Sequence, residues 1–458
     1  MNRNGLRSSF FVESTWIRPS LWLLSCAVPL LFAGCSSPSQ QSSDAGPGKD
    51  AGIEHDAIGM DVDATMDMDG GDAGVPQTCQ EQLQLDTPFE VDPQGPDSQI
   101  HAAVAFDGHD VWLVYNLPND NGDFDVYLSR FGCNGSRLMA PFKVNTTEGN
   151  DVDPDLAIAD DAIYVVWSSD NGTGIDNMDV AYRIFAPDGS PQMTSDRFLE
   201  TTYDATPVSG NVMSPQVAAL PTGGFAIAAV RGLPVASGFQ AFVQSLDENG
   251  SLVGNAVDGY VEDGRFDSYP SIAANSKGDI YLSYVRGGNG QDNEVVQAMI
   301  PAGDATPQPQ PPRVVATVAG DTSSFYAVDP ANDLLYLAYA SNDDIILTDG
   351  TDMNGSAASI TLGATSGRDY APRVVAAANG GAVFWYRNIS GFHNQFTAQG
   401  FTFDGSQFTL GTLRAVTDSL VPPYAPAAAH VVGDVYVVAW SEGDSPNFRM
   451  KMAFVSVP

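Results

Sequence analysis

Basic residues are scarce in this chain of 458 residues, which has 20 Lys and Arg against 56 Asp and Glu and a formal net charge of −36. Setting aside the ten acids and four bases of residues 1–78 leaves 46 acids and 16 bases in the remainder. Nucleic acids and anionic membrane surfaces are recognised by positive patches. The charge balance therefore argues against both, and we expect no nucleic-acid partner.

Long apolar runs are absent except near the N-terminus, where Leu21–Ala33 follows three arginines. That run is too short for a comfortable membrane span and is typical of a signal-peptide core. It ends in Ala33-Gly34-Cys35, which resembles the lipobox of bacterial lipoproteins. The resemblance implies that residues 1–34 are a signal peptide, that Cys35 is acylated and, because Ser36 follows, that the lipid anchors the protein to the outer membrane. An ordinary cleaved signal with an incidental Cys is the alternative.

Bulky apolar residues are almost missing from residues 35–78, which are rich in Ser, Asp, Ala and Gly. Such a segment buries too little surface to fold, so we expect a disordered acidic linker. Its Asp61-x-Asp63 and Asp67-x-Asp69 pairs favour a spacer over a calcium site, because no Gly-centred loop with a bidentate Glu accompanies them.

Histidines with metal-ligand spacing and the usual nucleotide or hydrolase fingerprints are also absent, which argues against zinc or redox-metal catalysis. What the remainder contains is a repeat. Seven copies of a short apolar run, a Gly- or Asp-bearing turn and a longer apolar run follow one another. Five copies start at a proline, the first starts at Ile100 and the degraded fifth copy is Phe325–Val328; the prolines are Pro154, Pro215, Pro270, Pro372 and Pro426.

Each copy continues with a third strand, an Asx-Gly hairpin and a fourth strand, as four-stranded antiparallel blades require. The last copy lacks a fourth strand, whereas a spare strand, Pro88–Val91, precedes the first copy. The sequence therefore predicts an all-β fold over residues 79–458: a seven-bladed β-propeller closed by the N-terminal strand completing the last blade. Six or eight blades, an open solenoid and paired β-sandwiches are the alternatives.

Two cysteines, Cys79 and Cys133, fall in the expected propeller. An even pair in an exported chain suggests a disulfide, and both residues lie on the same predicted face in adjacent blades. The bond would then hold the closing strand; two free thiols are the alternative.

One face of the predicted ring has the longer loops, those joining second to third strands and blade to blade, and binding usually resides in such loops. Aromatic rings stack on sugars and carboxylates accept from hydroxyls, which makes this face a candidate carbohydrate or peptide site. Packing of each Tyr between blades is the alternative. The candidate ligand-binding residues are Asp153, Arg265, Asp267, Tyr269, Arg368, Asp369, Tyr370 and Tyr424.

Clusters of Asp, Asn and Gly in two loops of the same face supply the oxygen ligands that Ca²⁺ prefers. The same residue types simply make turns, which is the stronger interpretation. The candidate calcium ligands are Asp120, Asp123 and Asp125 in one loop and Asp170, Asp176 and Asp179 in the next. No other cofactor is expected.

The run from Pro154 to Trp167 followed by Ser168-Ser169-Asp170-Asn171-Gly172 resembles repeat units of secreted bacterial propellers, including the sialidase-like class. That resemblance implies an arginine triad, for which Arg265, Arg368 and Arg373 are the candidates near the central channel, while Arg231, Arg286 and Arg387 end second strands; pairing with the abundant Asp is the alternative. The Asp-box form S-x-D-x-G-x-T-W is not completed, and no Tyr–Glu pair stands out. We therefore predict an outer-membrane-anchored binding or scaffold module for an extracellular ligand or protein. A propeller glycoside hydrolase or lyase acting on extracellular polysaccharide is the alternative.

Overall fold

A computed structural model describes residues 79–458 except at positions 160, 173–176, 200, 204–205, 209–211, 233–237, 260–264, 289–290, 303–311, 320–321, 330, 352, 354–356, 364–366, 391–392, 418–425 and 444–446. The predicted signal peptide, Cys35 and the linker lie outside the described residues, as do Asp176 and Tyr424. Among the helices of the described part, none is long and apolar enough to cross a membrane.

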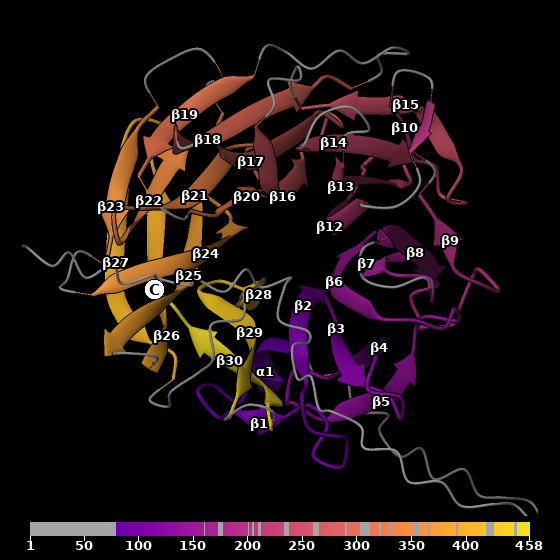
Figure 1. Cartoon of the computed structure of the whole chain (residues 1–458). Helices are drawn as coiled ribbons and strands as arrows, with labels where there is room; N and C mark the ends of the chain where they lie inside the picture. The colour runs from indigo at the N-terminus through magenta and orange to yellow at the C-terminus, as the bar shows by residue number, and fades with distance from the viewer. Residues whose placement is uncertain are drawn as a thin grey trace, which may run out of the picture. The chain divides into compact units, whose positions relative to one another are not determined.

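The described chain forms seven four-stranded antiparallel sheets, arranged as a ring in Figure 1. Blade 1 contains β2 (Ile100–Phe106), β3 (Val111–Pro118), β4 (Phe124–Phe131) and β5 (Arg137–Lys143). Blade 2 contains β6 (Asp151–Ile158), β7 (Ile163–Ser169), β8 (Asp179–Phe185) and β9 (Arg197–Phe198). Blade 3 contains β12 (Val212–Ala219), β13 (Phe225–Gly232), β14 (Phe239–Leu246) and β15 (Leu252–Asp258). Blade 4 contains β16 (Phe266–Ala274), β17 (Ile280–Gly288), β18 (Gln291–Ile300) and β19 (Arg313–Val318).

The remaining blades follow the same order, with the first strand of each nearest the ring centre (Figure 1). Blade 5 contains β20 (Ser324–Val328), β21 (Leu335–Ser341), β22 (Asp344–Asp349) and β23 (Ser359–Leu362). Blade 6 contains β24 (Arg368–Ala377), β25 (Gly380–Ser390), β26 (His393–Phe403) and β27 (Phe408–Ala415). Blade 7 contains β28 (Ala427–Val432), β29 (Val435–Glu442), β30 (Arg449–Ser456) and β1 (Phe89–Glu90). A short helix, α1 (Cys79–Gln82), precedes β1, and a hairpin of β10 (Thr201–Tyr203) and β11 (Thr206–Val208) separates blades 2 and 3.

The core lies between the blades. Second strands such as β3 and β7 are buried along almost their whole length, because a neighbouring blade covers each of their faces, whereas the outer strand β15 is largely exposed. Seven apolar clusters each join two neighbouring blades, including blades 7 and 1. Full burial of a Val, Leu or Phe side chain stabilises by about 1.5–3 kcal/mol, so each cluster holds two blades together.

The ring closes as the sequence predicts. Phe89 of β1 pairs with Met452 of β30, and Glu90 pairs with Lys451, so the N-terminal strand is the fourth strand of blade 7. The ring of Phe89 also packs against Phe131 of blade 1, at 5.8 Å between centroids. The closing strand therefore contacts both blades that meet at the seam, and it covers part of the edge of β30 that would otherwise be unpaired.

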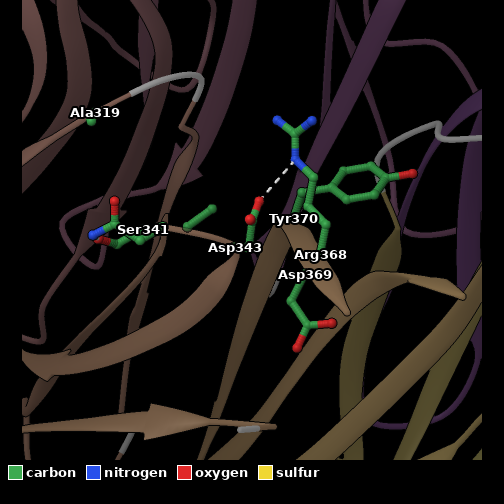
Figure 2. Close-up of a pocket in the computed structure, with 8 residues that line it drawn as sticks. Ala319, Ser341, Asp343, Arg368, Asp369 and Tyr370 are labelled. Atoms are coloured by element: carbon green, nitrogen blue, oxygen red, sulfur yellow. Dashed lines mark hydrogen bonds and ion pairs between the residues drawn. The ribbon is translucent and has the colours of Figure 1, made fainter. Parts of the chain in front are cut away.

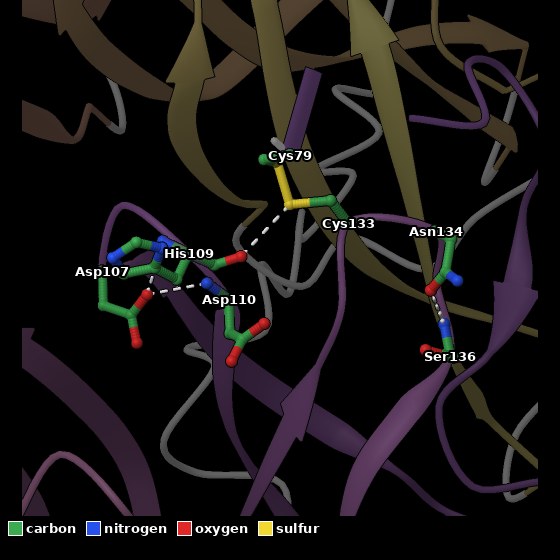
Figure 3. Close-up of a disulfide and its surroundings, with 7 residues drawn as sticks. All are labelled: Cys79, Asp107, His109, Asp110, Cys133, Asn134 and Ser136. Atoms are coloured by element: carbon green, nitrogen blue, oxygen red, sulfur yellow. Dashed lines mark hydrogen bonds between the residues drawn. A yellow bond between two sulfur atoms is a disulfide. The ribbon is translucent and has the colours of Figure 1, made fainter. Parts of the chain in front are cut away.

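The predicted disulfide joins Cys79 to Cys133, whose Cα atoms are 5.3 Å apart. It ties α1 to the turn between β4 and β5, beside the turn of Asp107–Asp110 (Figure 3). Because Cys79 precedes the closing strand by only ten residues, the bond fixes that strand to blade 1.

Candidate functional site

The two faces of the ring differ in their connections. First strands begin at the face formed by the second-to-third-strand connections, such as 119–123 and 342–343, and the blade-to-blade connections, such as 145–150. We call this the loop-rich face. The opposite, tight-turn face holds hairpin turns such as 107–110 and 132–136. The candidate ligand-binding residues that the structure describes all lie near the starts of first strands, at the loop-rich face.

A cavity of about 280 Å³ opens on the loop-rich face between blades 5 and 6. Its functional groups are the Arg368 guanidinium at the start of β24 and the side chains of the β21–β22 turn (Figure 2). Arg368 Nε lies 3.4 Å from Asp343 Oδ1, and Asp343 is 67% exposed. The complete lining is Ala319, Ala340, Ser341, Asn342, Asp343, Arg368, Asp369 and Tyr370.

The turn beside Arg368 is held by local backbone chemistry. Asn342 and Asp343 have φ of 51° and 70°, and they join the paired residues Ser341 and Asp344. Two central residues with positive φ are what a tight type I′ hairpin turn requires, and Asn and Asp tolerate that conformation. The turn therefore presents a carboxylate and an amide from a fixed backbone.

Asp369 has a structural role. Its side chain is buried and points away from the Arg368–Asp343 pair in Figure 2. Arg387 donates from Nε and Nη2 to its two oxygens, both at 2.8 Å. Burial raises the pKa of Asp369, and the bonds from Arg387 oppose that rise. This carboxylate fixes the start of β24 through its hydrogen bonds to Arg387, which belongs to the same blade.

Tyr370 lines the cavity but also packs inside blade 6. Its ring centroid lies 6.0 Å from that of Tyr386, and burial raises the pKa of its hydroxyl. Packing between blades, the alternative interpretation of the repeated tyrosines, accounts for part of its environment, because Tyr370 packs against the apolar cluster that joins blades 6 and 7. Of the three consecutive candidates at this cavity, Arg368 presents a partly exposed charged group to it.

The other candidates lie in different blades of the same face. Asp267 is buried against Arg286, whose Nε lies 3.1 Å from Oδ1, and Arg265 forms an ion pair with Glu294. Tyr269 is 44% exposed, and Asp153 Oδ1 lies 2.7 Å from His101 Nδ1 of the neighbouring blade. The structure therefore gathers Arg368, Asp369 and Tyr370 at one cavity and leaves the other described candidates, Asp153, Arg265, Asp267 and Tyr269, spread along the ring.

A backbone strain recurs at the loop-rich face, and it was not predicted from the sequence. In five blades one residue near the start of the first strand has a φ of 46–55°, beside a break in strand register. Bulges of this kind re-aim side chains, and a non-glycine residue held at such a φ costs on the order of 1–3 kcal/mol. Four of them precede a proline, which is the signal the sequence offered. They are His101, Asp153, Ser214, Tyr269 and Ala371.

The arginines mostly have acidic partners. Arg231 pairs with Asp258, and Arg387 and Arg286 each pair with the Asp opposite them on the first strand of their blade. Arg265 and Arg368, two members of the triad implied by the sialidase-like resemblance, pair with Glu294 and Asp343. These contacts indicate that each of these arginines pairs with an acidic residue of the protein, and not that they form one common site for the carboxylate of a ligand.

The proposed calcium ligands do not gather. Among the described residues there is no group of three or more His, Cys, Asp or Glu placed to hold a metal ion. Asp125 is buried and binds Lys143 and Asn145, each at 2.9 Å. Asp170 accepts from the backbone N–H groups of Asn150 and Gly172. These two carboxylates organise their own loops, as the turn interpretation expects, and with Asp176 undescribed the calcium hypothesis stays a prediction without a donor cluster.

No family model matches the chain, and no curated protein matches it in sequence. Among solved structures, it is similar to a polysaccharide lyase of the PL25 ulvan lyase family bound to -[GlcA(1-4)Rha3S]-. That match has 13% identity and a TM-score of 0.52, and covers 80% of this chain and 96% of the lyase. A fungal alcohol oxidase of the AA5 family in complex with copper matches at 12% identity and a TM-score of 0.50, covering 82% of this chain and 77% of that one.

A Hadza microbial sialidase also matches, at 10% identity and a TM-score of 0.44, with 73% of each chain covered. At such identities the comparisons establish the propeller fold alone. The fold is shared by proteins with different chemistry, so the function of this chain has to be argued from its own residues.

Proposed function

We propose that this protein is a binding module whose loop-rich face binds a carbohydrate chain outside the cytoplasm. The observation that carries the proposal is the cavity between blades 5 and 6, whose lining includes guanidinium, carboxylate, amide and hydroxyl groups. Its volume of about 280 Å³ lies just below the range that is usual for small-ligand pockets, about 300–1,000 Å³. A single sugar ring suits that size, and its hydroxyls can donate to Asp343 and accept from Arg368.

The exposure of the pair supports recognition rather than stability. Asp343 is 67% exposed and Arg368 is 31% exposed, and ion pairs in such surroundings contribute only about 0–1 kcal/mol to folding. A ligand hydroxyl that replaces water beside Arg368 and Asp343 can therefore be bound with little change in the stability of the folded protein. Peptide and protein ligands are the other classes that a polar loop face accommodates.

The N-terminal sequence supports a location of this module at the outer membrane. We propose that Cys35 carries the lipid and that residues 35–78 tether the propeller to the outer membrane, because a small-Gly-Cys sequence ends the apolar run. Labelling cells with a palmitate analogue tests the anchor. The wild-type chain is expected to incorporate label and fractionate with membranes, whereas Cys35→Ser loses both; retention of label in the variant would contradict acylation at Cys35.

Binding can be tested with a panel of neutral polysaccharides (xylan, dextran) and acidic ones (polygalacturonate, alginate, carrageenan), by affinity electrophoresis and calorimetry. Arg368→Gln and Asp343→Asn should each weaken binding about tenfold, because each removes a charged hydrogen-bonding partner. The matched controls are Arg130→Gln and Asp110→Asn, since this pair, 2.5 Å apart, lies on the tight-turn face. Equal loss in both sets of variants, or no binding to any polysaccharide, would contradict the proposal.

An enzyme is the second candidate, and the contact between His101 and Asp153 favours it. A carboxylate 2.7 Å from an imidazole nitrogen can orient a general acid or base. Incubation with the same polysaccharides would then produce new reducing ends or unsaturated sugars, and His101→Ala would abolish them. Binding without any product, in wild type and variant alike, leaves the binding module as the function.

A further inference from the structure

Arg373, on the first strand of blade 6, faces the ring centre. Its guanidinium lies over the ring of Phe325 in blade 5, 5.1 Å from the centroid. It also interacts electrostatically with Asp155 on the first strand of blade 2. Blades 2 and 6 are not neighbours, and the first strands of both surround the ring centre in Figure 1, so this electrostatic interaction acts across the centre.

The donors of Arg373 are unused within the described part of the chain. There, the Arg373 guanidinium forms no hydrogen bond and no ion pair with the protein, and its one specific contact is with the ring of Phe325. Other arginines in the fold differ: Arg387 has a bidentate carboxylate, and Arg183 donates to the carbonyls of Val144 and Met193. A half-buried guanidinium with five donors and no acceptor from the protein is suited to an acceptor supplied from outside.

Long-range neutralisation of Asp155 is the structural role that competes with this. Asp155 is almost fully buried, and its Oδ2 accepts from Val217 N at 2.9 Å. Burial raises the pKa of Asp155, and the positive charge of Arg373 opposes the rise. The carboxylate is thus anchored to the neighbouring blade by its own hydrogen bond, and it leaves the N–H groups of Arg373 unoccupied.

We propose that Arg373 forms an oxyanion-binding site at the ring centre, which takes one sulfate, phosphate or carboxylate group. A planar guanidinium binds two oxygens of such a group at once through N–H groups at its edge, while the ring of Phe325 packs against one face of its plane. The site is distinct from the cavity at Arg368 and does not depend on carbohydrate binding there. The ligand is either a free inorganic oxyanion or the acidic group of a sugar.

The charges around Arg373 determine the affinity that the site should have for an oxyanion. Residues 79–458 hold 46 acids and 16 bases, so the fold as a whole repels anions and binding has to come from contacts at Arg373. Asp155 is the nearby charge that opposes an incoming anion. Its replacement by Asn, which retains an oxygen to accept from Val217, should therefore strengthen oxyanion binding.

Calorimetric titration with sodium sulfate and, separately, sodium glucuronate tests the site at constant ionic strength set with sodium chloride. Arg373→Gln should weaken binding of the preferred anion at least about tenfold, and Asp155→Asn should strengthen it several-fold. The control is Arg130→Gln, which removes one positive charge from the tight-turn face and should leave affinity unchanged.

Circular dichroism melts establish whether each variant is folded. If Arg373→Gln does not fold, Arg373→Lys serves instead: it keeps the charge, loses the two-pronged geometry, and should still weaken binding. Preference for sulfate identifies a free inorganic anion, and preference for glucuronate identifies an acidic sugar. The site is overturned if neither anion binds the wild type, or if the folded Arg373 variant binds as the wild type does.

Discussion

Removal of the Cys79–Cys133 disulfide should destabilise the closed ring by a calculable amount. The two residues are 54 positions apart, and the bond crosses from the segment before the closing strand to blade 1. Constraint of an unfolded loop of that length corresponds to about 4 kcal/mol on the chain-entropy account. That cost is a large part of the roughly 5–15 kcal/mol by which native proteins are usually stable.

The perturbation is the double variant Cys79→Ser/Cys133→Ser, and the assay is urea unfolding followed by tryptophan fluorescence. The variant should lose about 4 kcal/mol of unfolding free energy, and reduction of the wild type with dithiothreitol should produce the same loss. The reductant should have no effect on the variant, which controls for its action elsewhere. A loss below about 1 kcal/mol in both experiments would refute the reasoning that this bond constrains the seam.

Three further predictions concern packing and charge. Phe89→Ala, at the seam, should lower the free energy of unfolding in urea by about 2 kcal/mol, whereas Phe266→Ala, at a residue that is 40% exposed, should lower it far less. Equal losses in the two variants would contradict the role of the closing strand. Asp369→Asn should cost about 3 kcal/mol in the same assay because it leaves Arg387, which is only 12% exposed, without its charge partner, while the exposed Asp343→Asn should be nearly neutral. A neutral Asp369→Asn would refute the pairing argument. Burial raises the pKa of Asp151 to about 7, so the folded chain keeps a proton that the unfolded chain releases near pH 4. The free energy of unfolding should therefore fall by up to about 4 kcal/mol as the pH rises from 4 to 7. Asp151→Asn should flatten this dependence in thermal melts across that range. An unchanged pH profile in Asp151→Asn would count against the last of these.

The repeat made the fold predictable from the sequence. Each copy carries strand-length apolar runs and turn residues at matching positions, so seven copies specify seven blades, and a spare N-terminal strand specifies the closure seen at Phe89 and Met452. Even the degraded fifth copy forms β20 over Ser324–Val328, close to the predicted Phe325–Val328. The hairpin of β10 and β11 was not predicted, because it interrupts the repeat with a pattern of its own.

The candidate site was predictable only in part. The sequence placed Arg368 and Tyr370 on the loop-rich face, where the structure also has them, since loop position follows from strand order. It did not show that Asn342 and Asp343 of the preceding blade complete the same cavity, because that depends on how neighbouring blades pack. Nor did composition distinguish Arg387, which is bound to Asp369, from Arg373, which has no such partner in the described part of the chain. Contacts between strands far apart in sequence decide those roles.

Hydrogen–deuterium exchange across the whole ring, with and without each polysaccharide of the panel, is the most direct measurement of ligand binding at the loop-rich face. With a polysaccharide that binds, the account predicts slower exchange in peptides covering 340–343 and 368–370, and unchanged exchange at the tight turns 107–110 and 132–136. Protection confined to the tight-turn face, or no protection with any polysaccharide, would contradict it.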